Sequence, residues 1–239
     1  MVCTFSHPIY DAVRPWLGGE RSLAALNRAA ATAGLRTESG KRLSFVPPGG
    51  RRGAYELRAH ETGEIETRPE SVHDWFNALC WLAFPRTKAR INAMHAAEMP
   101  REGGRRGRLR DLLTIFDEGG AIVLCADDEL NRLAREFRWK ELFWAERERV
   151  RRSMRFVVLG HAVLEQALKP WPGITCKALF ARSGEDPDHA AAAWLASRGE
   201  GASPRDLAPL PVFGYPGWAE NEREAFYDDE RYFRQGKAG

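Results

Sequence analysis

The chain has 239 residues, of which 44% are apolar and 10% are aromatic. This composition supports a sizeable hydrophobic core and excludes wholesale disorder. The 36 basic and 33 acidic side chains leave a net charge of +3, which is too close to balance to indicate nucleic-acid binding by itself.

The cysteines predict reduced thiols rather than disulfides or zinc ligands, because none lies in a C-x-x-C pair and the chain has ample core without cross-links. They are Cys3, Cys80, Cys125 and Cys176. The first residues lack the basic and apolar regions of a secretion signal, and no stretch approaches the ~18 uncharged apolar residues of a membrane span. We therefore expect a cytoplasmic protein without a membrane partner.

The first part of the chain predicts a helix and then a β-hairpin. Residues 20–33 are rich in alanine and leucine, and Gly34 ends the predicted helix. After a strand at 42–47, the hairpin is expected within residues 55–68, with Gly63 as the left-handed residue of its turn.

Two helices that meet at Pro85 are predicted between residues 73 and 98. Ser71 has the position of an N-cap for the first helix. Pro85 cannot continue that helix but suits the first turn of the next. The basic, glycine-broken segment 101–110 is a predicted loop.

Beyond this loop, four helices and two strands are predicted before a proline-rich end. The helices cover 108–118, 128–137, 139–168 and 189–199, and the strands cover 121–125 and 174–181. Four prolines without periodicity predict an extended surface wrap over 203–218.

These elements predict a single α+β domain over residues 1–239 that is mainly helical. A small antiparallel hairpin or sheet packs on the helical core. Residues 1–19 form an N-terminal extension in this interpretation, and residues 203–239 form an extended C-terminal wrap.

The predicted helix pair carries polar side chains at helical spacing. His73, Asn77 and Cys80 are at i, i+4 and i+7, so they share a face, and Asp74 is adjacent. A second face bears Lys88, Asn92 and His95. Either face can contribute to a site; the alternatives are helix capping for the first and simple solvation for the second.

His161 and Glu165 are at i, i+4 inside the long predicted helix 139–168, so we expect them to be buried and in contact, or linked through one ion or water. An imidazole–carboxylate contact serves a general base or a metal site. The alternative is a structural pair that locks two helices together.

Acidic residues before Gly119 suggest a cation site, because carboxylates at a helix C-terminus need an offsetting charge. Asp111, Asp117 and Glu118 are the residues concerned. The candidate ligands of a divalent metal are Asp117, Glu118, His161 and Glu165. Neighbouring arginines or plain solvation are the alternatives to a metal.

Two arginine clusters suggest a different kind of partner. Arginine beside aromatic residues grips single-stranded nucleic acid, although interleaved Glu146 and Glu148 favour a solvated helix face for the second cluster. The clusters are Arg101, Arg105, Arg106, Arg108 and Arg110, and Arg147, Arg149, Arg151, Arg152 and Arg155, the second preceded by Trp139, Phe143 and Trp144. The common nucleotide and hydrolase motifs are missing from the sequence.

The chain resembles a bacterial family, domain of unknown function 3025, from about Tyr55 to Arg234. The resemblance lies in HDWFNALCWLAFPRTKARINAMH, FDEGGAIVL, LGHAVLEQAL and the ending PLPVFGYPGW…NE…FYDD…FR. It implies a bacterial protein and brings no activity with it.

The residue chemistry therefore leaves three hypotheses. The first is a hydrolase, with or without a divalent metal, because His, Asp and Glu predominate among the candidates. The second is a binding protein for RNA or a protein partner, which uses the arginine clusters. The third is an assembly factor without pocket chemistry. The enzyme hypothesis places these side chains around one cleft: His73, Asp74, Asn77, His161 and Glu165.

Overall fold

A computed structural model describes residues 4–49, 55–101, 106–171 and 173–235. Helices predominate, and two small sheets accompany them, so the predicted mainly helical α+β class is confirmed. The helices are α1 (Arg14–Leu17), α2 (Leu23–Thr32), α3 (Tyr55–Thr62), α4 (Val72–Ala83), α5 (Pro85–Glu98), α6 (Arg108–Gly119), α7 (Asp128–Arg135), α8 (Arg147–Ser153), α9 (His161–Gln166) and α10 (Pro187–Ala196). The strands are β1 (Ser44–Val46), β2 (Glu64–Glu66), β3 (Gly120–Cys125), β4 (Met154–Val158), β5 (Thr175–Ala181) and β6 (Ala208–Pro211).

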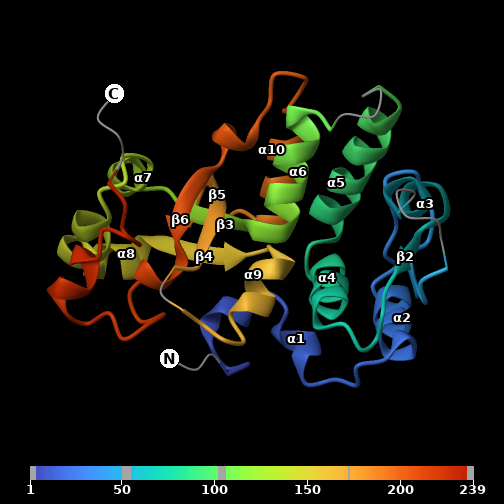
Figure 1. Cartoon of the computed structure of the whole chain (residues 1–239), viewed down its shortest axis with the longest axis horizontal. Coiled ribbons are helices and arrows are strands. Elements are labelled where there is room, and N and C mark those ends of the chain that lie inside the picture. Colours follow the sequence, from blue (N-terminus) through green and yellow to red (C-terminus); the bar gives the residue numbers. More distant parts are fainter. Residues whose placement is uncertain (1–3, 50–54, 102–105, 172, 236–239) are drawn as a thin grey trace.

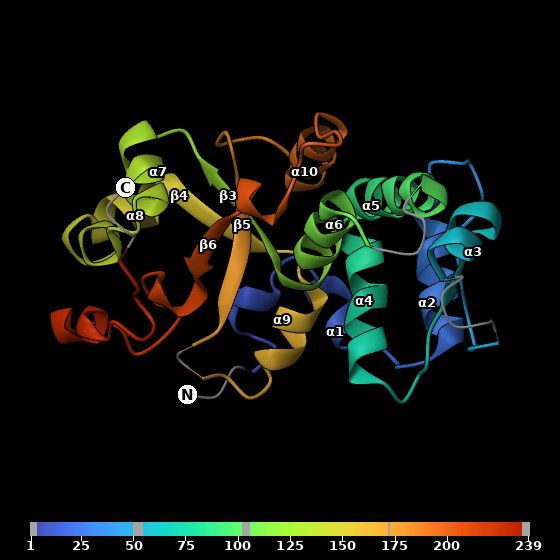
Figure 2. The same ribbon diagram turned by 45° about the horizontal axis from the view of Figure 1, so that its top comes forward.

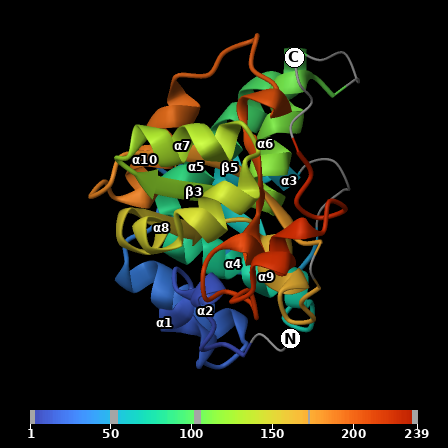
Figure 3. The ribbon, with the colours of Figure 1, turned by 90° about the vertical axis from the view of Figure 1, so that its left-hand side faces the viewer.

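The larger sheet of the described chain has the order β4-β3-β5-β6. Strand β3 pairs antiparallel with β4 and parallel with β5, and β6 closes the edge antiparallel to β5. All six residues of β3 are buried, as a continuous apolar run predicts for a central strand. Helices α7 and α8 lie at the end of the molecule away from α2 and α3 (Figures 1 and 3).

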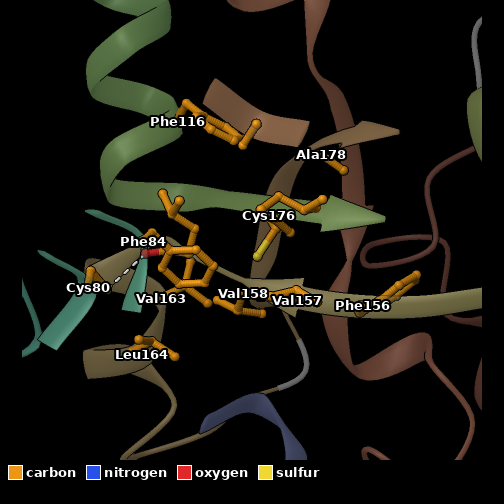
Figure 4. Packing of buried hydrophobic residues seen from close by; sticks show 14 of the residues in the cluster. Cys80, Phe84, Phe116, Phe156, Val157, Val158, Val163, Leu164, Cys176 and Ala178 are labelled. Carbon is orange, nitrogen blue, oxygen red and sulfur yellow. Dashed lines mark hydrogen bonds between the residues drawn. The ribbon is translucent and has the colours of Figure 1, made fainter. Parts of the chain in front are cut away.

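The other half of the molecule is helical. Helices α5 and α6 lie side by side, α4 leads into α5 at Pro85, α3 packs on α5, and α9 lies beside α4 (Figures 1 and 2). One hydrophobic core runs through the described residues of both halves. Figure 4 shows part of this core, with Phe116 of α6, Phe84 between α4 and α5, and Val158 and Cys176 of the sheet.

Several predicted boundaries are confirmed. Ser71 caps α4 by accepting a hydrogen bond from the Asp74 backbone N–H, and Pro85 begins α5. Gly34 follows α2 with φ +62°. Each position has the residue type that its backbone geometry favours.

The predicted hairpin at 55–68 is wrong. Residues 55–62 form α3, and β2 pairs parallel with β1. Gly63 has φ +81°, but it ends a helix rather than turning a hairpin, since its N–H donates to the Ala59 carbonyl at 2.9 Å. Arg58 then ties α3 to β2 through Glu64 and Glu66, at 2.6 Å each.

The predicted helix 139–168 is also wrong, because a strand interrupts it. A π-helical turn (Glu141–Ala145) and α8 precede β4, and α9 follows it. Phe156, Val157 and Val158 are β-formers that complete the sheet beside β3. Gly160 then begins the turn into α9.

The chain ends are more integrated than predicted. Ile9, Tyr10 and Val13 are buried in the core, and the Tyr10 hydroxyl donates to the Leu164 carbonyl at 3.2 Å. Within the proline-rich segment, residues 208–211 form β6. Proline suits such an edge strand because it needs no ladder N–H.

Among the described cysteines, the expected free thiols are found. Cys80, Cys125 and Cys176 are buried and unpaired by disulfides, and Cys3 lies outside the described residues.

Candidate active site

A polar cavity of about 550 Å³ lies among α3, α4, α5, α6 and the start of α9. It brings together most of the candidate residues from four separate segments of the chain. His73, Asp74, Asn77, Asp117, Glu118 and His161 all line it. Glu165 does not line the cavity but contacts His73, which does. The second polar face also lines the cavity: Lys88, Asn92 and His95 are buried rather than solvated.

Three candidate side chains form a hydrogen-bonded chain at the cavity wall. His73 Nδ1 lies 2.8 Å from Glu165 Oε2, and His73 Nε2 lies 3.1 Å from His161 Nε2. The predicted direct contact between His161 and Glu165 is therefore wrong, and so is the predicted burial of Glu165, whose side chain is 39% exposed. His73 of α4 stands between them, because α9 is a short helix packed against α4.

Hydrogen-bond donors and acceptors fix the protons of this chain. His161 Nδ1 lies 2.8 Å from the Asp117 backbone carbonyl, which only accepts, so Nδ1 carries a proton. Burial lowers the pKa of His161 to about 4, so its Nε2 is an unprotonated acceptor at neutral pH. His73 Nε2 must then donate to His161, and a hydrogen bond joins His73 Nδ1 to Glu165 Oε2.

Contact between the β4–α9 turn and the α6–β3 turn positions His161. The backbone N–H groups of Leu159 and Gly160 both donate to the Gly120 carbonyl, at 3.0 and 2.8 Å. This contact joins the start of α9 to the end of α6. It places the 3%-exposed His161 ring against Asp117. His73 and Glu165 are more open, with side-chain exposures of 42% and 39%.

Lys88 is a buried cation at the base of the cavity. Its ammonium group donates to Asn77 Oδ1 at 2.7 Å and pairs with Asp117 Oδ1, and it lies 5.5 Å from the centre of the Trp81 ring. Burial alone would raise the pKa of Asp117, but the charge of Lys88, with further help from His161, holds it below its usual value. Asp117 is therefore a carboxylate at neutral pH.

The same contacts orient Asn77 and Tyr55. Because Asn77 Oδ1 accepts from Lys88, its Nδ2 is the group that donates to the Tyr55 hydroxyl, at 3.3 Å. Burial raises the pKa of Tyr55, so this phenol keeps its proton. Tyr55 therefore presents a hydrogen-bond donor to the cavity that it lines.

Glu56 and Asn92 form a second polar group that lines the cavity. Asn92 Nδ2 donates to both the backbone carbonyl and the carboxyl Oε2 of Glu56, at 2.8 and 2.7 Å. Burial raises the pKa of Glu56 to about 7. Nearby His95 accepts from Arg110 Nε at 3.2 Å, and burial lowers the pKa of His95 to about 4. Tyr55 and Glu56 were missed from the sequence because their helix was predicted as a strand.

Two candidates of the first face have structural contacts instead. Arg68 clamps Asp74 through both carboxylate oxygens, at 2.7 and 2.9 Å. The Cys80 thiol donates to the Leu159 carbonyl at 3.1 Å (Figure 4), and burial raises its pKa to about 12. Asp74 therefore only borders the cavity, and Cys80 belongs to the core.

The candidate metal ligands do not fit a bound divalent ion. In the described part of the chain, no group of three or more His, Cys, Asp or Glu side chains is arranged to hold one. Asp117 is already paired with Lys88 and Glu165 with His73, while Asp111 pairs with Arg106 at 3.1 Å. Local cations supply the offsetting charge that these carboxylates need.

The second arginine cluster lies in a network of polar contacts. Arg149 pairs with Asp127 at 2.7 Å and Arg151 with Glu148 at 3.2 Å, while Arg147 donates to the Asn221 carbonyl at 3.0 Å. The Trp139 and Phe143 rings are buried and so do not offer faces to nucleic-acid bases. In the first cluster, Arg105 lies outside the described residues. Nucleic-acid binding stays a prediction that these contacts do not favour.

Among the described residues, none of the helices is both long and apolar enough to cross a membrane.

Comparison with family models matches residues 43–237 to DUF3025, described as a protein of unknown function. The chain belongs to this family, which confirms the resemblance seen in its motifs. No curated protein and no solved structure matches the chain.

Proposed function

We propose that this protein is a bacterial, cytoplasmic hydrolase that cleaves a small polar substrate by general acid–base catalysis. The observation that carries the proposal is the hydrogen-bonded chain from Glu165 through His73 and His161 to Asp117 at the wall of a polar cavity. Such a chain fixes the protonation of a histidine that faces a ligand space.

Each member of the chain has a distinct role in this proposal. His73 is the acid that gives its Nε2 proton to the leaving group, which replaces His161 as the acceptor of that proton. Glu165 orients the His73 ring, as the carboxylate of a catalytic triad does for its histidine. Burial keeps His161 neutral, and the Asp117 carbonyl fixes its tautomer.

Two donors of the cavity support charge that develops on the substrate. The Lys88 ammonium and the Tyr55 hydroxyl are donors set in a partly buried cavity. Fixed donors of this kind stabilise a developing oxyanion more strongly than water does. The free thiols of the described chain suit the reducing conditions of the cytoplasm.

The activity test uses three chromogenic probes: 4-nitrophenyl acetate, bis(4-nitrophenyl) phosphate and 4-nitroacetanilide. We expect His73→Gln and Glu165→Gln to lower the turnover of the probe that the wild type hydrolyses, by about 10²–10⁴-fold for the histidine. His189→Gln is the matched control, since His189 is exposed and lies outside the cavity. Full activity in His73→Gln would refute the proposal.

The protonation pattern is tested without a substrate. Long-range ¹H–¹⁵N spectra of the histidine rings at pH 7 should show His161 as the neutral Nδ1–H form and His73 with a proton on Nε2. A His161 ring protonated at Nε2 would contradict the proposed chain.

A further inference from the structure

Asn92 has a buried acceptor that the described protein residues leave without a partner. Asn92 is 1% exposed, and its Oδ1 has no hydrogen bond within the described residues. The orientation of this amide is fixed, because Nδ2 donates to the Glu56 backbone carbonyl, an atom that only accepts. Leaving a buried carbonyl oxygen unpaired is costly, so a donor from a ligand or water is expected there.

Glu56, which Asn92 contacts, supplies a second acceptor. Its carboxyl group holds Asn92 Nδ2 through Oε2 and leaves the other oxygen outside that bond. Both residues line the cavity that also contains His73. One water molecule can donate its two protons to these two acceptors. The lone pairs of that water then point away from Glu56 and Asn92.

We infer that Glu56 and Asn92 hold the water molecule that attacks the substrate, with Glu56 as its general base and Asn92 as the positioning residue. This inference rests on the proposed hydrolase function and identifies its nucleophile. Burial gives the Glu56 carboxyl a pKa of about 7, so it both accepts and releases a proton at neutral pH.

The proton movements balance in one turnover. Glu56 takes a proton from the water as the water oxygen bonds to the electrophilic atom of the substrate. The bond to the leaving group breaks, and the leaving group takes the Nε2 proton of His73. A proton then passes from Glu56 to His73 through solvent, which restores both groups.

The kinetic arm of the test uses the probe that the wild type hydrolyses. Glu56→Gln keeps an acceptor for Asn92 Nδ2 but removes the base, so kcat should fall by about 10²–10⁴-fold. Asn92→Ala should lower kcat by about 10-fold and leave KM nearly unchanged, since Asn92 acts through the water. Glu64→Gln is the control: this neighbouring carboxylate contacts Arg58 and does not line the cavity.

Chemical rescue separates catalysis from structure. In Glu56→Ala, added formate should restore part of the lost activity, because the small carboxylate replaces the base. A purely structural role for Glu56 would give no rescue. Thermal melts of each variant establish that the protein measured is folded.

The crystallographic arm needs no substrate. A high-resolution structure of the wild type should show an ordered water within about 2.6–3.2 Å of both Asn92 Oδ1 and the Glu56 carboxyl. A dry site would overturn the inference whatever the probes show. Wild-type activity in Glu56→Gln, with His73→Gln inactive, would overturn the water site alone, whereas an active His73→Gln would overturn the hydrolase proposal.

Discussion

Lys88 is the residue on which the polar side of the cavity depends. It is 3% exposed, and its partners are Asn77 and Asp117 from two other helices. An ammonium group in this position is stable only because a carboxylate and an amide oxygen replace its water. The same pairing keeps Asp117 ionised and directs the Asn77 amide toward Tyr55.

We therefore predict that Lys88→Met destabilises the protein strongly, by about 3–5 kcal/mol, because it leaves the Asp117 charge buried without its partner. Urea unfolding measures the loss. In the double variant Lys88→Met, Asp117→Asn, the uncompensated charge is gone and much of the stability should return. Equal stability losses in the single and double variants would contradict this account.

Individual site residues could be predicted from the sequence where their partners lie on the same helix. The i, i+4 spacing of His73 and Asn77 placed them correctly on one face of α4. The bond between His73 and Glu165 joins residues 92 positions apart, and helical spacing contains no information about it. Glu56 gave no signal because its segment was assigned to a strand.

At the scale of elements, the site depends on the contact between the α6–β3 and β4–α9 turns. Gly160 lies in this contact, where a Cβ atom would come within 2.6 Å of the Glu118 carbonyl oxygen and the Gly120 nitrogen. Since both are backbone atoms, neither can move without shifting a turn. The glycine is therefore required for close approach.

We expect Gly160→Ala to destabilise the protein by about 1–3 kcal/mol through this overlap and to weaken the His161–Asp117 contact. Gly119→Ala, in the facing α6–β3 turn, is a matched control, because a Cβ atom there meets nothing within 4 Å. Urea unfolding gives the stabilities, and the His161 ring signals report the displacement. If both variants unfold alike, the close contact does not limit this turn.

The elements that were predicted correctly have strong local signals at their ends. Pro85 and Ser71 define α4 and α5, and Gly119 ends α6. Prediction failed where tertiary pairing decided the outcome. Residues 154–158 are a strand because β3 lies beside them, and helix-favouring neighbours hid this. The sequence also contains no indication that β2 would pair with β1 in parallel.

For the whole molecule, buried ionisable groups of the cavity make the free energy of unfolding depend on pH, and they act in opposite directions. His95 and His161 titrate near pH 6.5 when unfolded and have pKa values of about 4 when folded. The unfolded chain therefore binds their protons first, and stability falls as pH decreases from 6.5 to 4. Glu56 behaves oppositely: its pKa rises from 4.5 to about 7 on folding, so its contribution is lost as pH increases over that interval.

Between pH 5 and 6 the unfolded chain thus takes up about two histidine protons, while the folded chain retains one on Glu56. Linkage then predicts that these three groups make the free energy of unfolding rise by about 1.4 kcal/mol per pH unit, and His7, whose pKa burial also lowers, adds to the rise. Glu56→Gln removes the opposing group and should roughly double this slope, whereas His95→Gln should bring it close to zero. Urea unfolding of the three proteins at closely spaced pH values measures the slopes. The same slope in wild type and Glu56→Gln would mean that Glu56 does not hold its proton in the folded protein, and its role as a base poised near neutrality would fall with it.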